Sequence, residues 1–382
     1  MGGGGRFFCD WHGLTRSATA AIFSVQNVFG CIHCFLAGWA VDRYGPKGTA
    51  LSIGLFTGLS LLLTSQTSAL WQLFITYSLL FSVVGAVYTT IMSTVSRWFD
   101  KNRGLALGLA GSGVGMGSIV IAPFAAYLIA HYGWRMAYII MGVIAWVIII
   151  PLSGILKKSP YDFGAEPGGA ESASGEGGTA LPGSEGNSHA TALTLRGASG
   201  TRSFWFFGCA WFLNAFCYFM VMIHLVPYAT DMGISAMDAA TALSLAGAGL
   251  IAGRLLTGRF SDSIGSKKTA VTCALLVVIS MIWLIRSRDL FSLYVFGVVF
   301  GFFNGGLDTA MAALVGDIFG IQNIGVIMGT LQINWGIGVI VGPAVGGIVF
   351  DAGNSYFAAF LAGALAMLAA SIFVALTRRE RL

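Results

Sequence analysis

GWAVDRYGPKG, residues 38–48, is a short charged loop between two long apolar runs of the chain. A second copy, GRFSDSIGSKK, occupies residues 258–268, and its Asp262 lies 220 positions after Asp42 of the first copy. A charged turn at the same place in two hydrophobic halves is typical of a duplicated membrane protein. The sequence therefore predicts two related halves, each with one such loop.

The composition excludes a water-soluble domain. Hydrophobic residues make up 56% of the 382 residues and charged residues only 10%, so little polar surface is available to cover a soluble core. Apolar runs of about 20 residues are long enough to cross a bilayer as helices. We expect an all-α polytopic membrane protein with eleven spans, near residues 17–41, 49–66, 69–96, 104–130, 135–156, 203–229, 238–258, 269–286, 290–314, 324–350 and 354–377.

The spans divide unevenly between two expected helical bundles. The N-terminal bundle, residues 1–156, has five spans, and the C-terminal bundle, residues 203–382, has six. One span precedes the first charged loop and two precede the second, so we expect the first helix of the N-terminal bundle to be missing. Residues 157–202 are rich in Gly, Ser, Ala and Glu, a composition that predicts a flexible linker.

The distribution of positive charge predicts the orientation. If the two charged loops are cytoplasmic, fifteen Lys and Arg residues lie on that side and five on the other. This agrees with the positive-inside rule. We expect an integral protein of the plasma (inner) membrane with a cytoplasmic C-terminus.

The cysteines do not predict a metal site or a secreted disulfide framework. Cys31, His33 and Cys34 lie close together, but inside an apolar run with no second pair of ligands nearby. We interpret them as packing residues and expect neither a metal nor a cofactor. The chain also has no H-E-x-x-H motif or ligating cluster across spans, which argues against a membrane-embedded enzyme.

The charged loops resemble the signature G-x-x-x-D-R-x-G-x-[KR] of the major facilitator superfamily. A further stretch, WFDKNRGLALGLAGSG at residues 98–113, resembles the signature of its monocarboxylate-porter branch, which includes the oxalate–formate exchangers. The resemblance implies two bundles that rock about a central site, with the loops as a conformational latch. The expected latch residues are Gly38, Asp42, Arg43, Gly45, Lys47, Gly258, Asp262, Gly265 and Lys267, and the branch signature is carried by Trp98, Phe99, Lys101, Arg103 and Gly108. We expect Asp42 and Asp262 to accept hydrogen bonds from a helix N-terminus or an arginine.

Arg254 is the candidate substrate-binding residue. It precedes Asp262 by eight positions, which places it about 12 Å along a helix from the loop, near the middle of the hydrocarbon layer. Arginine at that depth is costly and usually marks a pathway, and its planar fork fits a carboxylate. The alternatives are a structural ion pair and a side chain that extends toward the cytoplasm. The resemblance also implies substrate binding, because Arg254 matches the arginine of the carboxylate porters.

Proton coupling has two candidates. Some members of the branch carry an acid four positions before the arginine, where this chain has Leu250. Asp308 lies about 13 Å deep by helix rise, level with Arg254, and is a possible replacement. His224 is the second candidate because histidine titrates near neutral pH. For both, structural hydrogen bonding is the alternative. Further substrate-binding candidates are Tyr88, His224, Tyr228, Asn304, Asn334 and Trp335.

The sequence thus predicts a secondary carrier that moves a small organic anion, a monocarboxylate with a proton, by alternating access. The alternatives are an exchanger of organic anions such as oxalate and formate, and a truncated remnant that does not transport. The expected partners are the anion, protons and the lipid bilayer, without nucleic acid, and we expect a monomer.

Overall fold

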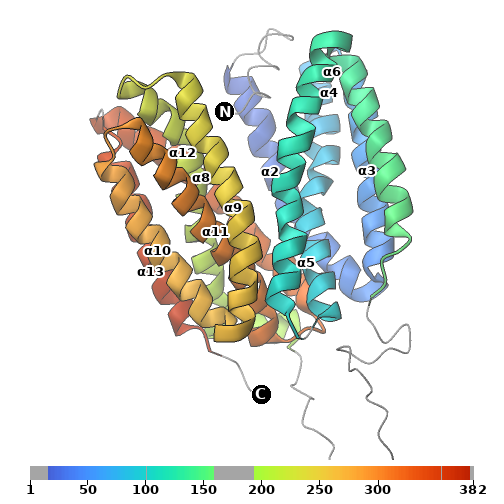
Figure 1. Ribbon diagram of the computed structural model, residues 1–382. Coiled ribbons are helices and arrows are strands. Elements are labelled where there is room, and N and C mark those ends of the chain that lie inside the picture. Colours follow the sequence, from blue (N-terminus) through green and yellow to red (C-terminus); the bar gives the residue numbers. More distant parts are fainter. Residues whose placement is uncertain (1–15, 100, 159–192, 354, 379–382) are drawn as a thin grey trace, which may run out of the picture.

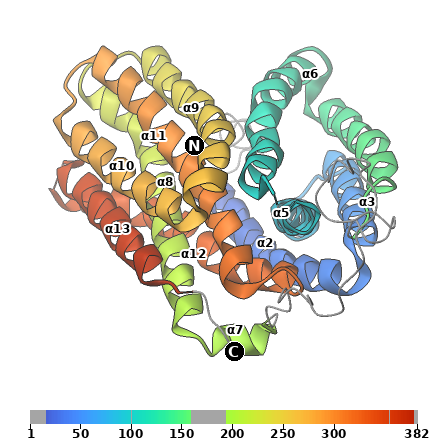
Figure 2. The same cartoon turned by 60° about the horizontal axis from the view of Figure 1, so that its bottom comes forward.

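The computed structural model describes residues 16–99, 101–158, 193–353 and 355–378, and these residues form two groups of helices that lie side by side (Figures 1 and 2). Residues 1–15 lie outside the described residues. The expected all-α class is confirmed, since the described residues form helices and connecting turns without a strand.

The first group contains α2 (Arg16–Tyr44), α3 (Pro46–Ser65) and a span built from four consecutive pieces. These pieces are α4 (Leu70–Leu73), the π-helical η1 (Phe74–Leu80), the 3₁₀-helical η2 (Phe81–Gly85) and α5 (Ala86–Trp98). The group ends with α6 (Arg103–Ser153).

The second group begins with the short helix α7 (Leu195–Ser199) and continues with six long helices. They are α8 (Arg202–Asp231), α9 (Ala236–Ile264), α10 (Ser266–Arg286), α11 (Leu290–Phe319), α12 (Ile324–Gly353) and α13 (Phe357–Leu376). The largest buried side chains of the described residues are concentrated here, among them Phe207, Trp211 and Phe300.

Ten helices in the described part of the chain are long and apolar enough to cross a membrane, one fewer than the eleven spans expected. The difference arises at α6, whose 51 residues cover two of the expected spans. At 1.5 Å per residue this helix would be about 77 Å long, more than twice the hydrocarbon thickness. It does not run straight, because Gly133 has φ 76° and ψ 163° and breaks the helical path. Figure 1 shows α6 rising in the middle of the molecule and descending beside α3.

The two arms of α6 have different neighbours. A Cβ on Gly108 of the first arm would meet the backbone of α9, and a Cβ on Gly142 of the second arm would meet the carbonyl of Gly58 in α3. Arg135, just after the break, donates to the Ser65 carbonyl at the end of α3 (3.2 Å). The first arm therefore faces the other half of the molecule, and the second arm packs within its own half.

The two ends of the expected linker are ordered: they form a short helix and hydrogen bonds with the helical groups. Residues 195–199 form α7, capped by Thr194, whose hydroxyl accepts from the Gly197 amide. Leu193 is buried, and its carbonyl accepts from Asn323 (3.1 Å). At the other end Lys158 donates to the Asp42 carbonyl (2.6 Å). Short polar and apolar contacts thus hold these ends against the helical groups, while residues 159–192 lie outside the described residues.

Candidate functional site

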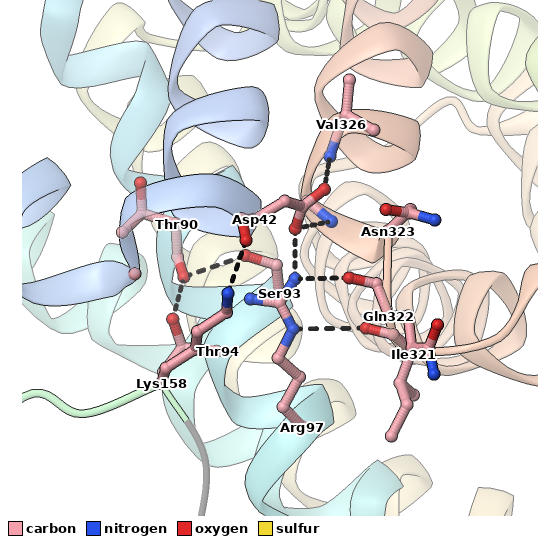
Figure 3. A network of polar contacts seen from close by, with 12 residues as sticks. Asp42, Thr90, Ser93, Thr94, Arg97, Lys158, Ile321, Gln322, Asn323 and Val326 are labelled. Carbon is pink, nitrogen blue, oxygen red and sulfur yellow. Dashed lines mark hydrogen bonds and ion pairs between the residues drawn. The ribbon is translucent and has the colours of Figure 1, made fainter. Parts of the chain in front are cut away.

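Asp42 joins the two halves at the side of the molecule where the charged loops lie, which we call the signature-loop side. It is near the C-terminal end of α2, and its two carboxylate oxygens accept from the amides of Gly325 (3.0 Å) and Val326 (2.7 Å). These amides belong to the first turn of α12, where unpaired N–H groups and the helix dipole favour an anion. Figure 3 shows this network.

Arg97 reinforces the same contact. Its guanidinium forms a close ion pair with Asp42 and also donates to the carbonyls of Ile321 and Gln322, both at 3.2 Å (Figure 3). Arg97 belongs to α5 of the first half, whereas the two carbonyls precede α12 of the second. One arginine therefore binds both the Asp42 carboxylate and the chain that leads into the capped helix.

Asp262 makes the equivalent contact with the halves exchanged. It lies near the C-terminal end of α9 and accepts from the amides of Gly104 (2.6 Å) and Leu105 (3.0 Å) in the first turn of α6. Beside it, Arg103 forms an ion pair with Asp317 (3.1 Å). The expected capping of a helix N-terminus by both aspartates is confirmed, and the two halves cap each other reciprocally.

Close glycine contacts between the helices follow each aspartate cap, and we call each such line of contacts a seam. In the first seam, between α2 and α12, a Cβ on Gly38 would meet the Gly325 backbone and one on Gly329 would meet the Cys34 carbonyl. In the second seam, between α6 and α9, Gly104 meets Gly258 in the same way. Small residues let helix backbones approach closely where lipid provides no hydrophobic drive.

The second seam ends partway along its helices. Gly108 still meets the backbone of Arg254, and Gly115 meets the side chain of Ile251. Farther from the loops, a Cβ on Gly117 of α6 or Gly247 of α9 would meet nothing within 4 Å. Among these glycines, the close contacts between α6 and α9 therefore lie toward the signature-loop side.

A cavity of about 810 Å³ lies between the two halves. Each bordering helix contributes residues spaced three or four apart, which puts them on one face. The residues relevant to the chemistry are Tyr88, Trp211, Asn214, Tyr218, Arg254, Asn304, Asp308, Gln332 and Trp335.

A buried ion pair forms the charged part of this cavity. Arg254 of α9 and Asp308 of α11 are 8% and 9% exposed, and the Arg254 Nη2 atom lies 2.7 Å from Asp308 Oδ2. The first half contributes two partners: the Tyr88 hydroxyl donates to Asp308 Oδ1 (3.3 Å), and the Gly111 carbonyl accepts from Arg254 Nη1. The pair is therefore held by both halves.

The structure brings some of the other expected binding residues to the cavity and not the rest. Asn304 and Trp335 line it, and the Asn304 amide donates to the Phe300 carbonyl (2.8 Å). His224 instead pairs with the Pro343 carbonyl (2.9 Å), and Tyr228 donates to the carbonyl of Ser287 (3.1 Å). Asn334 faces Gly208 of α8. The last three are absent from the cavity lining and occupy contacts within the second half.

The remaining signature residues lie at the loop side with structural contacts. Arg43 stacks over Trp39, and Lys267 donates to the Thr377 carbonyl (2.6 Å). Trp98 donates to the Lys157 carbonyl (2.9 Å). Lys101 is exposed, and so is Lys47 in the first turn of α3. Gly45 and Gly265 both have positive φ, 87° and 99°, which explains why glycine ends the helix before each charged turn.

The cavity residues that were not predicted from the sequence include Trp211, Asn214, Tyr218 and Gln332. The first three are spaced three and four apart along α8, so they share one helix face. That polar and aromatic face was visible as a pattern. Its direction was not, because the rest of α8 is largely apolar and periodicity does not show which face meets the cavity.

Comparison with known proteins agrees with this architecture. The family model described as Major Facilitator Superfamily matches residues 11–285 and 248–382. Relatives include monocarboxylate transporter 13 of Bos taurus, 25% identical over 96% of this chain and 82% of the relative, and monocarboxylate transporter 12 of Xenopus laevis, 26% identical over 97% and 82%.

Similar solved structures are transporters as well. The fucose:proton symporter of E. coli matches with a TM-score of 0.72 and 15% identity, covering 95% of this chain and 91% of that one. A human organic anion transporter matches with a TM-score of 0.71 and 14% identity, covering 97% and 88%. The chain therefore belongs to the Major Facilitator Superfamily of membrane transporters.

Proposed function

We propose that this transporter carries a small organic carboxylate together with a proton by alternating access. The supporting observation is the Arg254–Asp308 ion pair, buried in a cavity that both halves line. The names of the relatives, monocarboxylate transporters 12 and 13, point to the same class of substrate.

Charge balance supports proton coupling. The ion pair is neutral as a whole, because one guanidinium faces one carboxylate. A bound carboxylate would add a negative charge in a region where uncompensated charge is expensive. A proton on Asp308 restores neutrality and at the same time weakens its hold on Arg254. The guanidinium fork is then free to bind the substrate carboxylate through two hydrogen bonds.

The contacts of the pair suggest how binding would reach the latches. Arg254 also donates to the Gly111 carbonyl of α6, on the arm that Asp262 caps at its N-terminus. A substrate that reorients Arg254 would alter this contact within the second seam. In our proposal the signature-loop side is cytoplasmic. The described conformation is then closed toward the cytoplasm, and the substrate enters from the outer side.

Transport by reconstituted protein tests this function. The full 382-residue chain would be placed in proteoliposomes and offered labelled acetate, lactate and phenylpropanoate, with and without an inwardly directed proton gradient. We expect the gradient to accelerate uptake of at least one of them and a protonophore to remove the acceleration. Uptake that requires an anion inside and ignores the gradient would identify an exchanger. No carboxylate uptake in either mode would contradict the proposal.

A further inference from the structure

One face of α8 lines the cavity with aromatic and amide side chains. Trp211, Asn214 and Tyr218 all border it, and so does Phe219. Tyr218 stacks on Phe300 with parallel rings 6.1 Å apart, and Phe219 meets Trp335 edge to face at 6.1 Å. These ring contacts hold the wall of the second half in place opposite the groups from the first half.

Asn214 is the unexplained residue of this wall. It is 2% exposed, and its Oδ1 atom has no hydrogen-bond partner within the described part of the chain. A buried amide oxygen without a partner is unfavourable, so its retention calls for a group that supplies the missing donor.

A second acceptor of the same kind borders the cavity. The Oε1 atom of Gln332, on α12, is also buried without a partner among the described residues. It lies one helical turn from Trp335, another lining residue. Two amide side chains with unsatisfied buried oxygens therefore lie among the aromatic rings that border the cavity.

The cavity volume also bears on the size of the ligand. Its 810 Å³ falls within the range of about 300–1,000 Å³ for sites that hold multi-ring or similarly large ligands. A two- or three-carbon acid bound at Arg254 would leave most of this volume, including much of the aromatic wall, unfilled.

From these observations we propose that Asn214 is a specificity-determining residue, whose side-chain amide forms a hydrogen bond with a hydroxyl group on the transported carboxylate. The substrate is then a ring-bearing carboxylate with a donor on its body. This inference rests on the proposed function, because Arg254 supplies the anchor for the carboxylate. A site built to pair with a donor discriminates strongly against the analogue that lacks it.

The test compares molecules that differ by one hydroxyl group. Binding of phenylpropanoate and of its meta- and para-hydroxy derivatives would be measured by calorimetry on the full chain in lipid nanodiscs. We expect at least one hydroxylated compound to bind about tenfold or more tightly than phenylpropanoate. Asn214→Leu should remove this preference while phenylpropanoate keeps its affinity. The matched control is Leu213→Met, a volume-conserving change at the neighbouring position, which does not line the cavity.

A stability measurement separates recognition from a structural role. Asn214→Leu removes an unpaired buried amide oxygen, so the melting temperature of the ligand-free protein should rise. A lower melting temperature together with weaker binding of every compound would show that the amide stabilises the fold, and would overturn the inference.

The remaining outcomes are also decisive. Equal binding of all three compounds to the wild type, or a hydroxyl preference that survives in folded Asn214→Leu, overturns the role of Asn214. If binding of these compounds is nevertheless lost in Arg254→Ala, the carboxylate site of the proposed function stands. If the wild type binds none of these compounds and transports no carboxylate, both proposals fail.

Discussion

Arg254 and Asp308 depend on each other. Both are buried, and a buried ion pair contributes little net stability, although removing one partner leaves a charge without compensation. Tyr88 and Gly111 hold the pair without adding a charge. The arrangement is suited to a site that has to give up its internal ion pair when a charged ligand arrives.

Because the two charges compensate each other, the single substitution should lower the stability of the protein more than the double substitution does. Arg254→Leu should destabilise the protein by about 3 kcal/mol, because Asp308 is left buried without its partner. The double variant Arg254→Leu/Asp308→Leu should recover most of this loss. Thermal unfolding in the same detergent measures both effects. If the double variant were no more stable than the single one, the two side chains would not act as a pair.

Proton coupling gives a second prediction for this pair. Asp308→Asn cannot gain or lose a proton, so a proton gradient should no longer accelerate carboxylate uptake. Exchange of external for internal carboxylate should continue, because that reaction needs no net proton transfer. Leu213→Met, at a position outside the cavity lining, is the control and should retain gradient-driven uptake. Full gradient-driven uptake by Asp308→Asn would assign the proton to another group.

At the scale of the helices, the two halves are joined by caps and glycine seams. Asp42 caps α12 and Asp262 caps α6, and each seam begins at the cap. Closure at the signature-loop side therefore depends on backbone contact in the first turns of these helices. Bulk in a seam should favour separation of the halves at this side.

Gly258→Ala tests the second seam. Its new Cβ would collide with the Gly104 backbone of α6, so the signature-loop side should open more often. The measurement is maleimide labelling of a cysteine placed at Leu107, which is 1% exposed, after replacement of the native cysteines. Gly247→Ala on the same helix is the matched control, since its Cβ would meet nothing within 4 Å. Equal labelling of the two variants would contradict the seam.

The caps should differ in strength. Asp42 accepts from two amides and also pairs with Arg97, whereas Asp262 has the two amide contacts. Asp42→Asn should therefore open the signature-loop side more than Asp262→Asn does. A cysteine at Met328, buried in α12, reports this opening through its labelling rate. Unchanged labelling in Asp42→Asn would show that the carboxylate does not hold the side closed.

At the scale of the whole molecule, the repeat predicted the two-bundle architecture, and helix rise predicted the common depth of Arg254 and Asp308. Rise gives only the height of a side chain. The direction of His224, Tyr228 and Asn334 is set by packing among α8, α10 and α12, which no single helix pattern contains. For the same reason, the sequence did not show that Asn214 faces the cavity. The helix α7 is too short to be predicted from periodicity.

The connection between the halves gives a prediction at this scale. Its described ends are bound, through Lys158 to Asp42 and through Leu193 to Asn323. Deleting residues 166–185, which spares both ends, should leave the melting temperature and carboxylate uptake near wild-type values. Extending the deletion through residue 199 should lower the melting temperature, because it removes buried Leu193 and α7. If the shorter deletion alone abolished folding, the connection would have a further structural role.

Binding of a carboxylate at Arg254 is the central claim, and calorimetry on purified protein tests it most directly. The ligand is whichever of acetate, lactate and phenylpropanoate the proteoliposomes take up fastest. Arg254→Ala is compared with Arg259→Ala, an exposed arginine on the same helix, after thermal unfolding has shown that both variants are folded. We predict wild-type affinity in Arg259→Ala and no measurable binding in Arg254→Ala. Wild-type affinity in folded Arg254→Ala would contradict the account.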